Sequence, residues 1–127
     1  MITRVMVANR GEIARRVFAT CRRLGIGTVA VYTDPDAGSP HVAEADARVH
    51  IDSYLDAEQL VQAALSAGAD AVHPGYGFLS ENAGFADAVL GAGLAWIGPP
   101  AAAVTAMGSK IEAKKMMAAA GVPVLAE

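Results

Sequence analysis

A ten-residue stretch, HPGYGFLSEN at positions 73–82, combines residue types that suit a binding loop. Gly75 and Gly77 can adopt positive φ angles and let a ligand approach the backbone closely. Tyr76 stands between them without a bulky neighbour, so its ring face could contact a ligand. The other interpretation is a stiff turn in which Tyr76 packs onto its own domain, and local chemistry leaves both open.

A second polar turn, NRGE at 9–12, follows a short apolar run. Arg10 could meet an anion at the start of the next helix, where unpaired N–H groups and the helix dipole favour negative charge. However, Gly11 does not open a G-x-G-x-x-G fingerprint, and no acidic residue is clearly placed to bind a ribose. We therefore favour a tight strand-to-helix turn, with Glu12 in the first helical turn, over a dinucleotide site.

Lys110 is a third candidate. It follows MGS at the predicted start of a helix, where a cation is unfavourable beside the helix dipole, and this placement suggests a nearby anion. Lys114 and Lys115 share the same predicted helix, and the usual interpretation of such a group is a solvated face.

The histidines and the cysteine predict no metal site. His41, His50 and His73 lack metal-ligand spacing and have no partnering cysteines. His73 ends a predicted buried strand, so we expect a hydrogen-bonded structural histidine there. The single cysteine, Cys21, lies on the apolar face of a predicted helix and is expected in the core.

The elements that must position these residues alternate between strand and helix. The predicted strands are 4–8, 28–33, 48–51, 70–75 and 94–98, with a further strand start at 122–127. The predicted helices are 12–25, a short one from Pro40, 57–68 capped by Asp56, 81–93 capped by Ser80, 101–109 and 110–121. On the first helix, Ile13, Val17, Cys21 and Leu24 share one apolar face.

Strands that alternate with helices of 10–15 residues predict βαβ units and a parallel sheet. Ligands of such sheets collect at the carboxyl ends of the strands. Three predicted strand ends carry polar loops with glycine, namely NRGE, TDPDAGS and HPGYGFLSEN. These loops are the expected surroundings of a site.

Composition narrows the class of protein. The 127 residues suit one domain, and 54% of them are hydrophobic. A net charge of −3 with 18% charged residues argues against nucleic acid as the main partner. One cysteine excludes an internal disulfide and suits a reducing compartment. The first apolar run is broken by Asn9, Arg10 and Glu12, so it is neither a signal peptide nor a membrane span, and we expect a cytoplasmic protein.

Three segments, VMVANRGEIARRV, HPGYGFLSENAGFA and WIGP…MGSKIEAK, together closely resemble the N-terminal part of biotin carboxylases. These enzymes are the biotin-carboxylating α-chains of acetyl-, propionyl- and other acyl-CoA carboxylases, with pyruvate carboxylase as a relative. The match is collinear and covers essentially the whole chain. It implies a Rossmann-like, three-layer α/β pre-ATP-grasp domain with a mainly parallel sheet over 1–109. Over 110–127 it implies a helix and a strand start that lead toward an ATP-grasp domain expected beyond residue 127.

The resemblance also implies an activity. Family members use MgATP and bicarbonate to carboxylate biotin, the first half-reaction of acyl-CoA carboxylation in fatty acid or propionyl-CoA metabolism. Lys110 matches the lysine of an MG-x-K motif that contacts ATP phosphate, and Tyr76 and Gly77 match a loop at the biotin end of the site. The family's catalytic and magnesium-binding residues are expected downstream, so the 127-residue chain alone is expected to be inactive. The implied partners are a biotin carboxyl carrier protein or domain, a carboxyltransferase subunit and a second copy in a homodimer.

Two other classes remain as alternatives. One is a stand-alone nucleotide-binding α/β domain. The other is an assembly or dimerisation module, because Arg15, Arg16, Arg22 and Arg23 lie within an arc of roughly 120° on the first predicted helix. Such a face is usually solvated or locally paired, but in the resembling family the same helix lies near the dimer contact.

Overall fold

Five parallel strands form the middle layer of the fold. The computed structural model describes residues 2–98. Its strands are β1 (Arg4–Val7), β2 (Gly27–Tyr32), β3 (Ala47–His50), β4 (Ala71–His73) and β5 (Ala95–Trp96). They are arranged in the order β3-β2-β1-β4-β5, and every neighbouring pair is parallel. The first strand in the sequence is therefore the central strand of the sheet.

The central strand β1 and its neighbour β2 are mostly buried because helices cover the sheet on both faces. In β1, Val5 pairs with Thr28 of β2 on one side and with Ala71 of β4 on the other. Three of the four β1 residues and four of the six β2 residues are buried. This explains why both strands read as continuous apolar runs.

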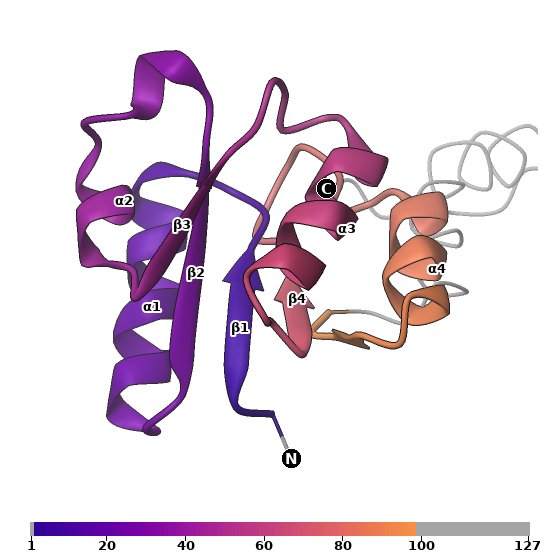
Figure 1. Cartoon of the computed structure of the whole chain (residues 1–127), viewed down its shortest axis with the longest axis horizontal. Helices are drawn as coiled ribbons and strands as arrows, with labels where there is room; N and C mark the ends of the chain where they lie inside the picture. The colour runs from indigo at the N-terminus through magenta and orange to yellow at the C-terminus, as the bar shows by residue number, and fades with distance from the viewer. Residues whose placement is uncertain (1, 99–127) are drawn as a thin grey trace, which may run out of the picture.

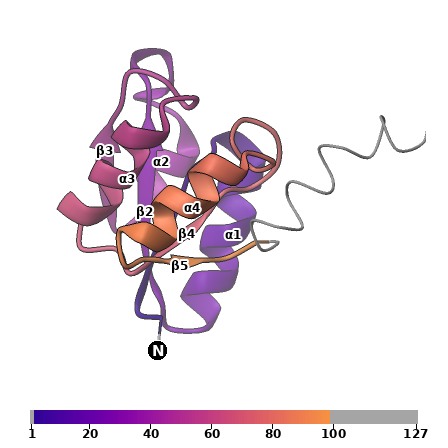
Figure 2. The same cartoon turned by 90° about the vertical axis from the view of Figure 1, so that its right-hand side faces the viewer.

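Within residues 2–98, four helices form the outer layers, two on each face (Figure 1). They are α1 (Gly11–Arg23), α2 (Pro40–Glu44), α3 (Ala57–Ser66) and α4 (Ala83–Gly91), and a 3-10 turn η1 spans Asp34–Asp36. Figure 1 shows α1 and α2 to the left of the sheet and α3 and α4 to the right, and Figure 2 shows the second pair from its own side. The predicted three-layer α/β fold with a parallel sheet is confirmed.

Two apolar clusters hold the layers together. Alternate residues of β1 point to opposite faces, as the period of a strand requires. Met6 packs with the α3 and α4 side chains Leu60 and Phe85. Val5 and Val7 pack instead with the α1 side chains Ala14, Phe18 and Cys21, so Cys21 is a core residue as expected.

The predicted apolar face of α1 is partly wrong. The residues of α1 that are buried against the sheet are Ala14, Phe18 and Cys21. Ile13 and Val17 are only half-buried, and Leu24 is 68% exposed. Both stripes have helical spacing, so periodicity alone does not distinguish them. The stripe that contains Phe18 faces the sheet, and the aliphatic stripe borders an open groove beside it.

The helix caps agree with the sequence at α3 and differ at α4. The Asp56 carboxylate accepts the Gln59 N–H at 3.0 Å, which confirms the predicted cap of α3. Ser80 was the predicted cap of α4, but the helix begins at Ala83 and its cap is Asn82. The Asn82 side chain accepts the Phe85 N–H at 2.9 Å. Ser80 belongs to the preceding turn, where its N–H donates to the Gly77 carbonyl.

Substitution of the two candidate caps should distinguish them. Asn82→Ala is expected to lower the free energy of unfolding by about 1 kcal/mol, because an N–H of the first turn of α4 loses its acceptor. Ser80→Ala should change it by less than about 0.5 kcal/mol. Urea unfolding of both variants beside the wild type measures the difference. A larger loss for Ser80→Ala than for Asn82→Ala would contradict this assignment.

The predicted helices 101–109 and 110–121, the strand start at 122–127 and the domain boundary at 109/110 lie outside the described residues and stay predictions.

Candidate functional site

The ends of β1, β2 and β4 bring three polar loops together, as the sequence predicted. Residues 9–10 follow β1, residues 34–36 follow β2 and residues 73–82 follow β4. The Ala8 N–H donates to the His73 carbonyl at 2.9 Å, which places the first and third loops side by side. The loop at 73–82 follows β4 and therefore lies beside the end of the central strand β1.

Asn9 fastens this loop from inside the fold. Its side-chain nitrogen Nδ2 donates to the Pro74 carbonyl at 3.1 Å and to the Tyr76 carbonyl at 2.6 Å. Its side-chain oxygen Oδ1 accepts the Arg10 N–H at 2.8 Å. Asn9 is only 2% exposed, so a single buried amide joins the first loop to the third.

The backbone of the loop explains its glycines. Gly75 and Gly77 have φ angles of +67° and +68°, as the sequence predicted. A Cβ on Gly75 would lie 2.6 Å from Asn9 Nδ2, so Gly75 also leaves room for the Asn9 amide. Phe78 adopts φ +48° without being glycine, an uncommon conformation that costs energy.

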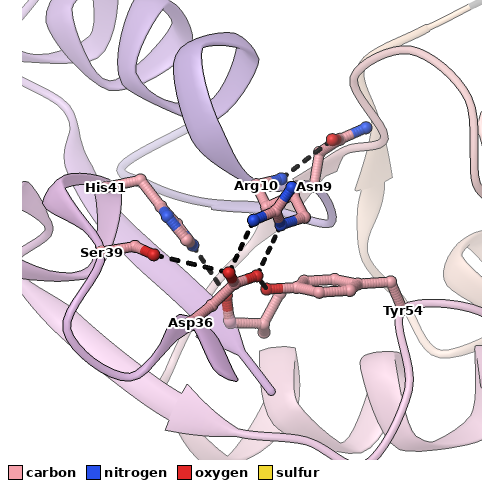
Figure 3. Close-up of polar contacts among 7 residues, drawn as sticks. Asn9, Arg10, Asp36, Ser39, His41 and Tyr54 are labelled. Atoms are coloured by element: carbon pink, nitrogen blue, oxygen red, sulfur yellow. Dashed lines mark hydrogen bonds and ion pairs between the residues drawn. The ribbon is translucent and has the colours of Figure 1, made fainter. Parts of the chain in front are cut away.

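An ion pair between an exposed arginine and a buried aspartate joins the first and second loops (Figure 3). The Arg10 guanidinium donates from Nε to Asp36 Oδ2 at 2.5 Å and from Nη2 to Asp36 Oδ1 at 2.6 Å. The Tyr54 hydroxyl donates to Asp36 Oδ2 at 2.7 Å. The Asp36 side chain is 7% exposed and that of Arg10 is 49% exposed. The anion that Arg10 meets is therefore a carboxylate of its own chain.

The charges of this cluster are fixed at neutral pH. Hydrogen bonds from Arg10 hold the pKa of Asp36 far below its usual value of 3.8 and outweigh the opposing effect of burial, and Tyr54 lowers it further. The hydrogen bond with Asp36 and its charge raise the pKa of Arg10. Burial, followed by the bond to Asp36, raises the pKa of Tyr54 to about 12. None of the three side chains gains or loses a proton near pH 7. Their role is structural: they hold the first and second loops together, and we call this cluster of Arg10, Asp36 and Tyr54 the clamp.

The clamp extends to the loop at 73–82 through an aromatic contact. The rings of Tyr54 and Phe78 stack with centroids 5.1 Å apart and an angle of 28° between their planes. Tyr54 thus contacts Asp36 with its hydroxyl and Phe78 with its ring. The loop is held at its start by Asn9 and at Phe78 by Tyr54.

Tyr76 lies between these two attachments and is 77% exposed. It borders an open apolar groove of about 770 Å³, together with Ile13, Val17 and Ile97. His73 also borders the groove, and its Nδ1 accepts the Gly75 N–H at 3.0 Å. Burial lowers the pKa of His73, which keeps the ring neutral as this bond requires. The expected structural histidine is confirmed, and Tyr76 is not packed away.

Sequence reasoning named Tyr76 and the glycines but missed Asn9, Asp36 and Tyr54 as partners. Their signal was weak, because the contacts join residues far apart in the chain. Arg10 and Asp36 are 26 positions apart, and Asn9 and Tyr76 are 67 apart. Lys110, the other predicted site residue, lies outside the described residues.

Two further classes of feature are not found between residues 2 and 98. In this part of the chain no group of three or more His, Cys, Asp or Glu side chains could hold a metal ion. No helix in the same range has the length and apolar character needed to cross a membrane.

The family model and two curated relatives that match this chain all name biotin carboxylases or acyl-CoA carboxylases. The family described as "Biotin carboxylase, N-terminal domain" matches residues 1–104. The α-subunit of mitochondrial methylcrotonoyl-CoA carboxylase from Oryza sativa subsp. japonica is 54% identical over 98% of this chain and 18% of its own length. Biotin carboxylase 2 from Bacillus subtilis is 50% identical over 98% of this chain and 30% of its own length.

A solved structure adds a likeness in three dimensions. The biotin carboxylase domain dimer of Hydrogenobacter thermophilus 2-oxoglutarate carboxylase, in complex with MgADP, ADP and bicarbonate, is 46% identical with a TM-score of 0.87. The alignment covers 98% of this chain and 29% of that one. The chain thus spans less than a third of the length of these relatives.

Proposed function

The chain belongs to the family of biotin carboxylase N-terminal domains, and we propose that it is the N-terminal part of an ATP-dependent ligase that carboxylates biotin. The observation that carries this proposal is the match of residues 1–104 together with the loop at 73–82. In that loop an exposed tyrosine ring is presented on a fixed backbone. Bicarbonate supplies the carboxyl group in this activity, and ATP supplies the free energy.

Each predicted site residue has a place in the proposal. Tyr76 and Gly77 line the biotin end of the site. Both are exposed, which fits residues that touch a substrate. Lys110, outside the described residues, binds an ATP phosphate. The ligands for magnesium are proposed to lie in the region expected downstream.

The proposal extends to partners and location. A homodimer is supported by the dimer named for the Hydrogenobacter domain. A biotin carboxyl carrier and a carboxyltransferase subunit are the partners that an acyl-CoA carboxylase α-chain requires. A cytoplasmic location is supported by the single, buried and unpaired Cys21, although the rice relative is mitochondrial by name.

The test uses the full-length enzyme that contains this chain. Wild-type enzyme is expected to carboxylate free biotin with MgATP and bicarbonate. Lys110→Gln should raise the KM for ATP roughly tenfold or more, because a charge-assisted hydrogen bond contributes about 1.5–3 kcal/mol. Lys114→Gln removes a charge from the same predicted helix and should leave the KM unchanged. An equal effect of both variants on the KM for ATP would assign Lys110 to the solvated face. A wild-type enzyme that does not carboxylate biotin would overturn the proposed biotin carboxylase activity.

The 127-residue chain alone separates this proposal from a stand-alone nucleotide-binding domain. We expect no turnover and a Kd for MgATP weaker than about 1 mM, which corresponds to roughly −4 kcal/mol. Micromolar binding in calorimetry would favour the stand-alone domain.

The assembly alternative has less support, because the four arginines of α1 have partners within this chain. Arg15 donates to the Glu44 carboxylate and Arg16 to the Glu12 carboxylate. Arg22 donates to the Glu44 backbone carbonyl and Arg23 to the Thr20 hydroxyl.

A further inference from the structure

We propose that Asn9 is a positioning residue for biotin carboxylation: from inside the fold it sets the backbone of residues 74–77 and thereby the direction in which Tyr76 meets its substrate. This inference rests on the proposed function, because it assumes that Tyr76 lies at the biotin end of the site. Asn9 itself is buried and touches no substrate.

The hydrogen bonds of Asn9 are those that only an amide side chain can make. Its nitrogen donates two bonds, to the carbonyls of Pro74 and Tyr76, and its oxygen accepts one from the Arg10 N–H. An aspartate of the same shape has no hydrogen on either oxygen when it is ionised, so it would repel both carbonyls. An alanine would leave both carbonyls without these donors.

The loop is also shaped around the volume of this side chain. A Cβ added to Gly75 would lie 2.6, 2.8 and 2.9 Å from Asn9 Nδ2, Cβ and Cγ. The same Cβ test at Gly77, which has a similar φ angle, finds nothing within 4 Å. Only Gly75 is pressed against Asn9, so the chain wraps around the amide at this point.

A second attachment stops the loop from turning about the first. Phe78, two residues beyond Tyr76, stacks on Tyr54, and Tyr54 is held by Asp36. Asp36 is in turn held by Arg10, the neighbour of Asn9. Both attachments therefore lead back to the residues that follow the central strand.

The side chain between these attachments is left exposed. The backbone carbonyl of Tyr76 is bonded to Asn9, while its residue as a whole is 77% exposed. A turn that served only the fold would have no need to fix the backbone on both sides of an exposed ring. Fixed backbone with an accessible side chain is the arrangement expected of a preorganised binding residue.

The test measures two activities of the full-length enzyme. Asn9→Ala is expected to lower kcat/KM for biotin at least tenfold, because displacement of a substrate-contacting group by about 1 Å can cost a hundredfold in rate. Bicarbonate-dependent ATP cleavage without biotin should stay within about twofold, because the two carbonyls that Asn9 holds belong to the loop proposed at the biotin end. Tyr76→Ala should show the same selective loss at least as strongly.

Asp70→Ala is the matched control. Asp70 precedes β4 at its amino end and accepts bonds from Thr3 N and Arg4 N at 2.9 and 3.0 Å. Asp70 therefore supports the same pair of strands as Asn9, β1 and β4, but at their amino ends instead of their carboxyl ends. We expect this variant to lose stability and to keep the wild-type ratio of the two activities.

Two measurements keep the inference testable if Asn9→Ala does not fold. Phe78→Leu removes the second attachment at a partly exposed position and should give a smaller selective loss of biotin-dependent turnover. Chymotrypsin cleavage within residues 73–82, located by mass spectrometry, should be faster in Phe78→Leu than in Asp70→Ala.

The outcomes separate the inference from the function on which it rests. Equal loss of both activities in Asn9→Ala, or the same change of their ratio in Asp70→Ala, overturns the positioning role. An unchanged biotin dependence in Tyr76→Ala overturns it as well, while the wild-type enzyme still carboxylates biotin. Absence of carboxylation in the wild type would instead overturn the proposed function.

Discussion

Replacement of Asp36 by asparagine is expected to lower the free energy of unfolding by about 2–4 kcal/mol, measured by urea unfolding at pH 7. Loss of one member of a buried ion pair typically costs about 3–5 kcal/mol. The expected value is smaller here because the Arg10 side chain is 49% exposed and water can solvate it. Asparagine keeps the size of the side chain, so the loss reports the charge and its hydrogen bonds.

The pH dependence of this difference has a definite sign. The pKa of Asp36 is lower in the folded protein than its usual value of 3.8, so its contribution to stability is complete above that value. It is lost as the pH falls toward the depressed pKa of the folded state. The difference between wild type and Asp36→Asn should therefore be constant from pH 7 down to about 4 and narrow at lower pH.

A surface ion pair of similar length is the control. Arg15 and Glu44 lie 2.7 Å apart, with side chains 44% and 28% exposed. Glu44→Gln is expected to cost less than about 1 kcal/mol, because exposed ion pairs contribute little. A loss for Asp36→Asn as small as that for Glu44→Gln would contradict the clamp.

Gly75→Ala is expected to be the most damaging single-methyl addition in the loop, with a loss of about 3 kcal/mol. Two effects add. A residue with a side chain costs about 1–2 kcal/mol in the left-handed region that Gly75 occupies at φ +67°. Overpacking against the Asn9 amide, where the new Cβ would lie at 2.6 Å, adds about 1–3 kcal/mol.

Gly77→Ala separates the two effects. Its φ of +68° is nearly the same, but nothing lies within 4 Å of an added Cβ. Only the backbone strain applies, so the expected loss is about 1–2 kcal/mol. Urea unfolding of the two variants in parallel measures the difference. Equal losses would show that contact with Asn9 adds nothing.

Local sequence patterns predicted most helices and strands of this fold, because whether a segment forms a helix or a strand depends largely on residues that are close in the sequence. An apolar run such as 4–8 and the helical spacing after Glu12 depend on neighbours in the sequence. Element ends were less well predicted, since both Ser80 and Asn82 are good caps and the tight turn after Gly77 decides between them. The choice between the two stripes of α1 depends on which one faces the sheet, and only the packed structure settles that.

The sequence predicted the exposed residues of the candidate site but not the buried residues that hold them in place. Tyr76 and its flanking glycines are adjacent in the chain, so their composition marks them. Asn9 and Asp36 act through contacts that exist only once the strand order is set. The sequence left open a foreign anion at Arg10, beside the favoured tight turn, because the carboxylate that Arg10 binds lies 26 residues away.

The position of β1 in the sheet has a consequence for synthesis on the ribosome. Among the five described strands, β1 is made before the other four, and it becomes the central one. Arg4 at its start meets Asp70, 66 residues later, just before β4 begins. At roughly 5–20 residues per second, translation takes about 3–13 s to cover that separation. During this interval the growing chain carries an apolar strand with one open edge, the kind of edge that pairs with other chains. A strand that is open to mispairing during translation is thus one that the finished fold encloses on both edges.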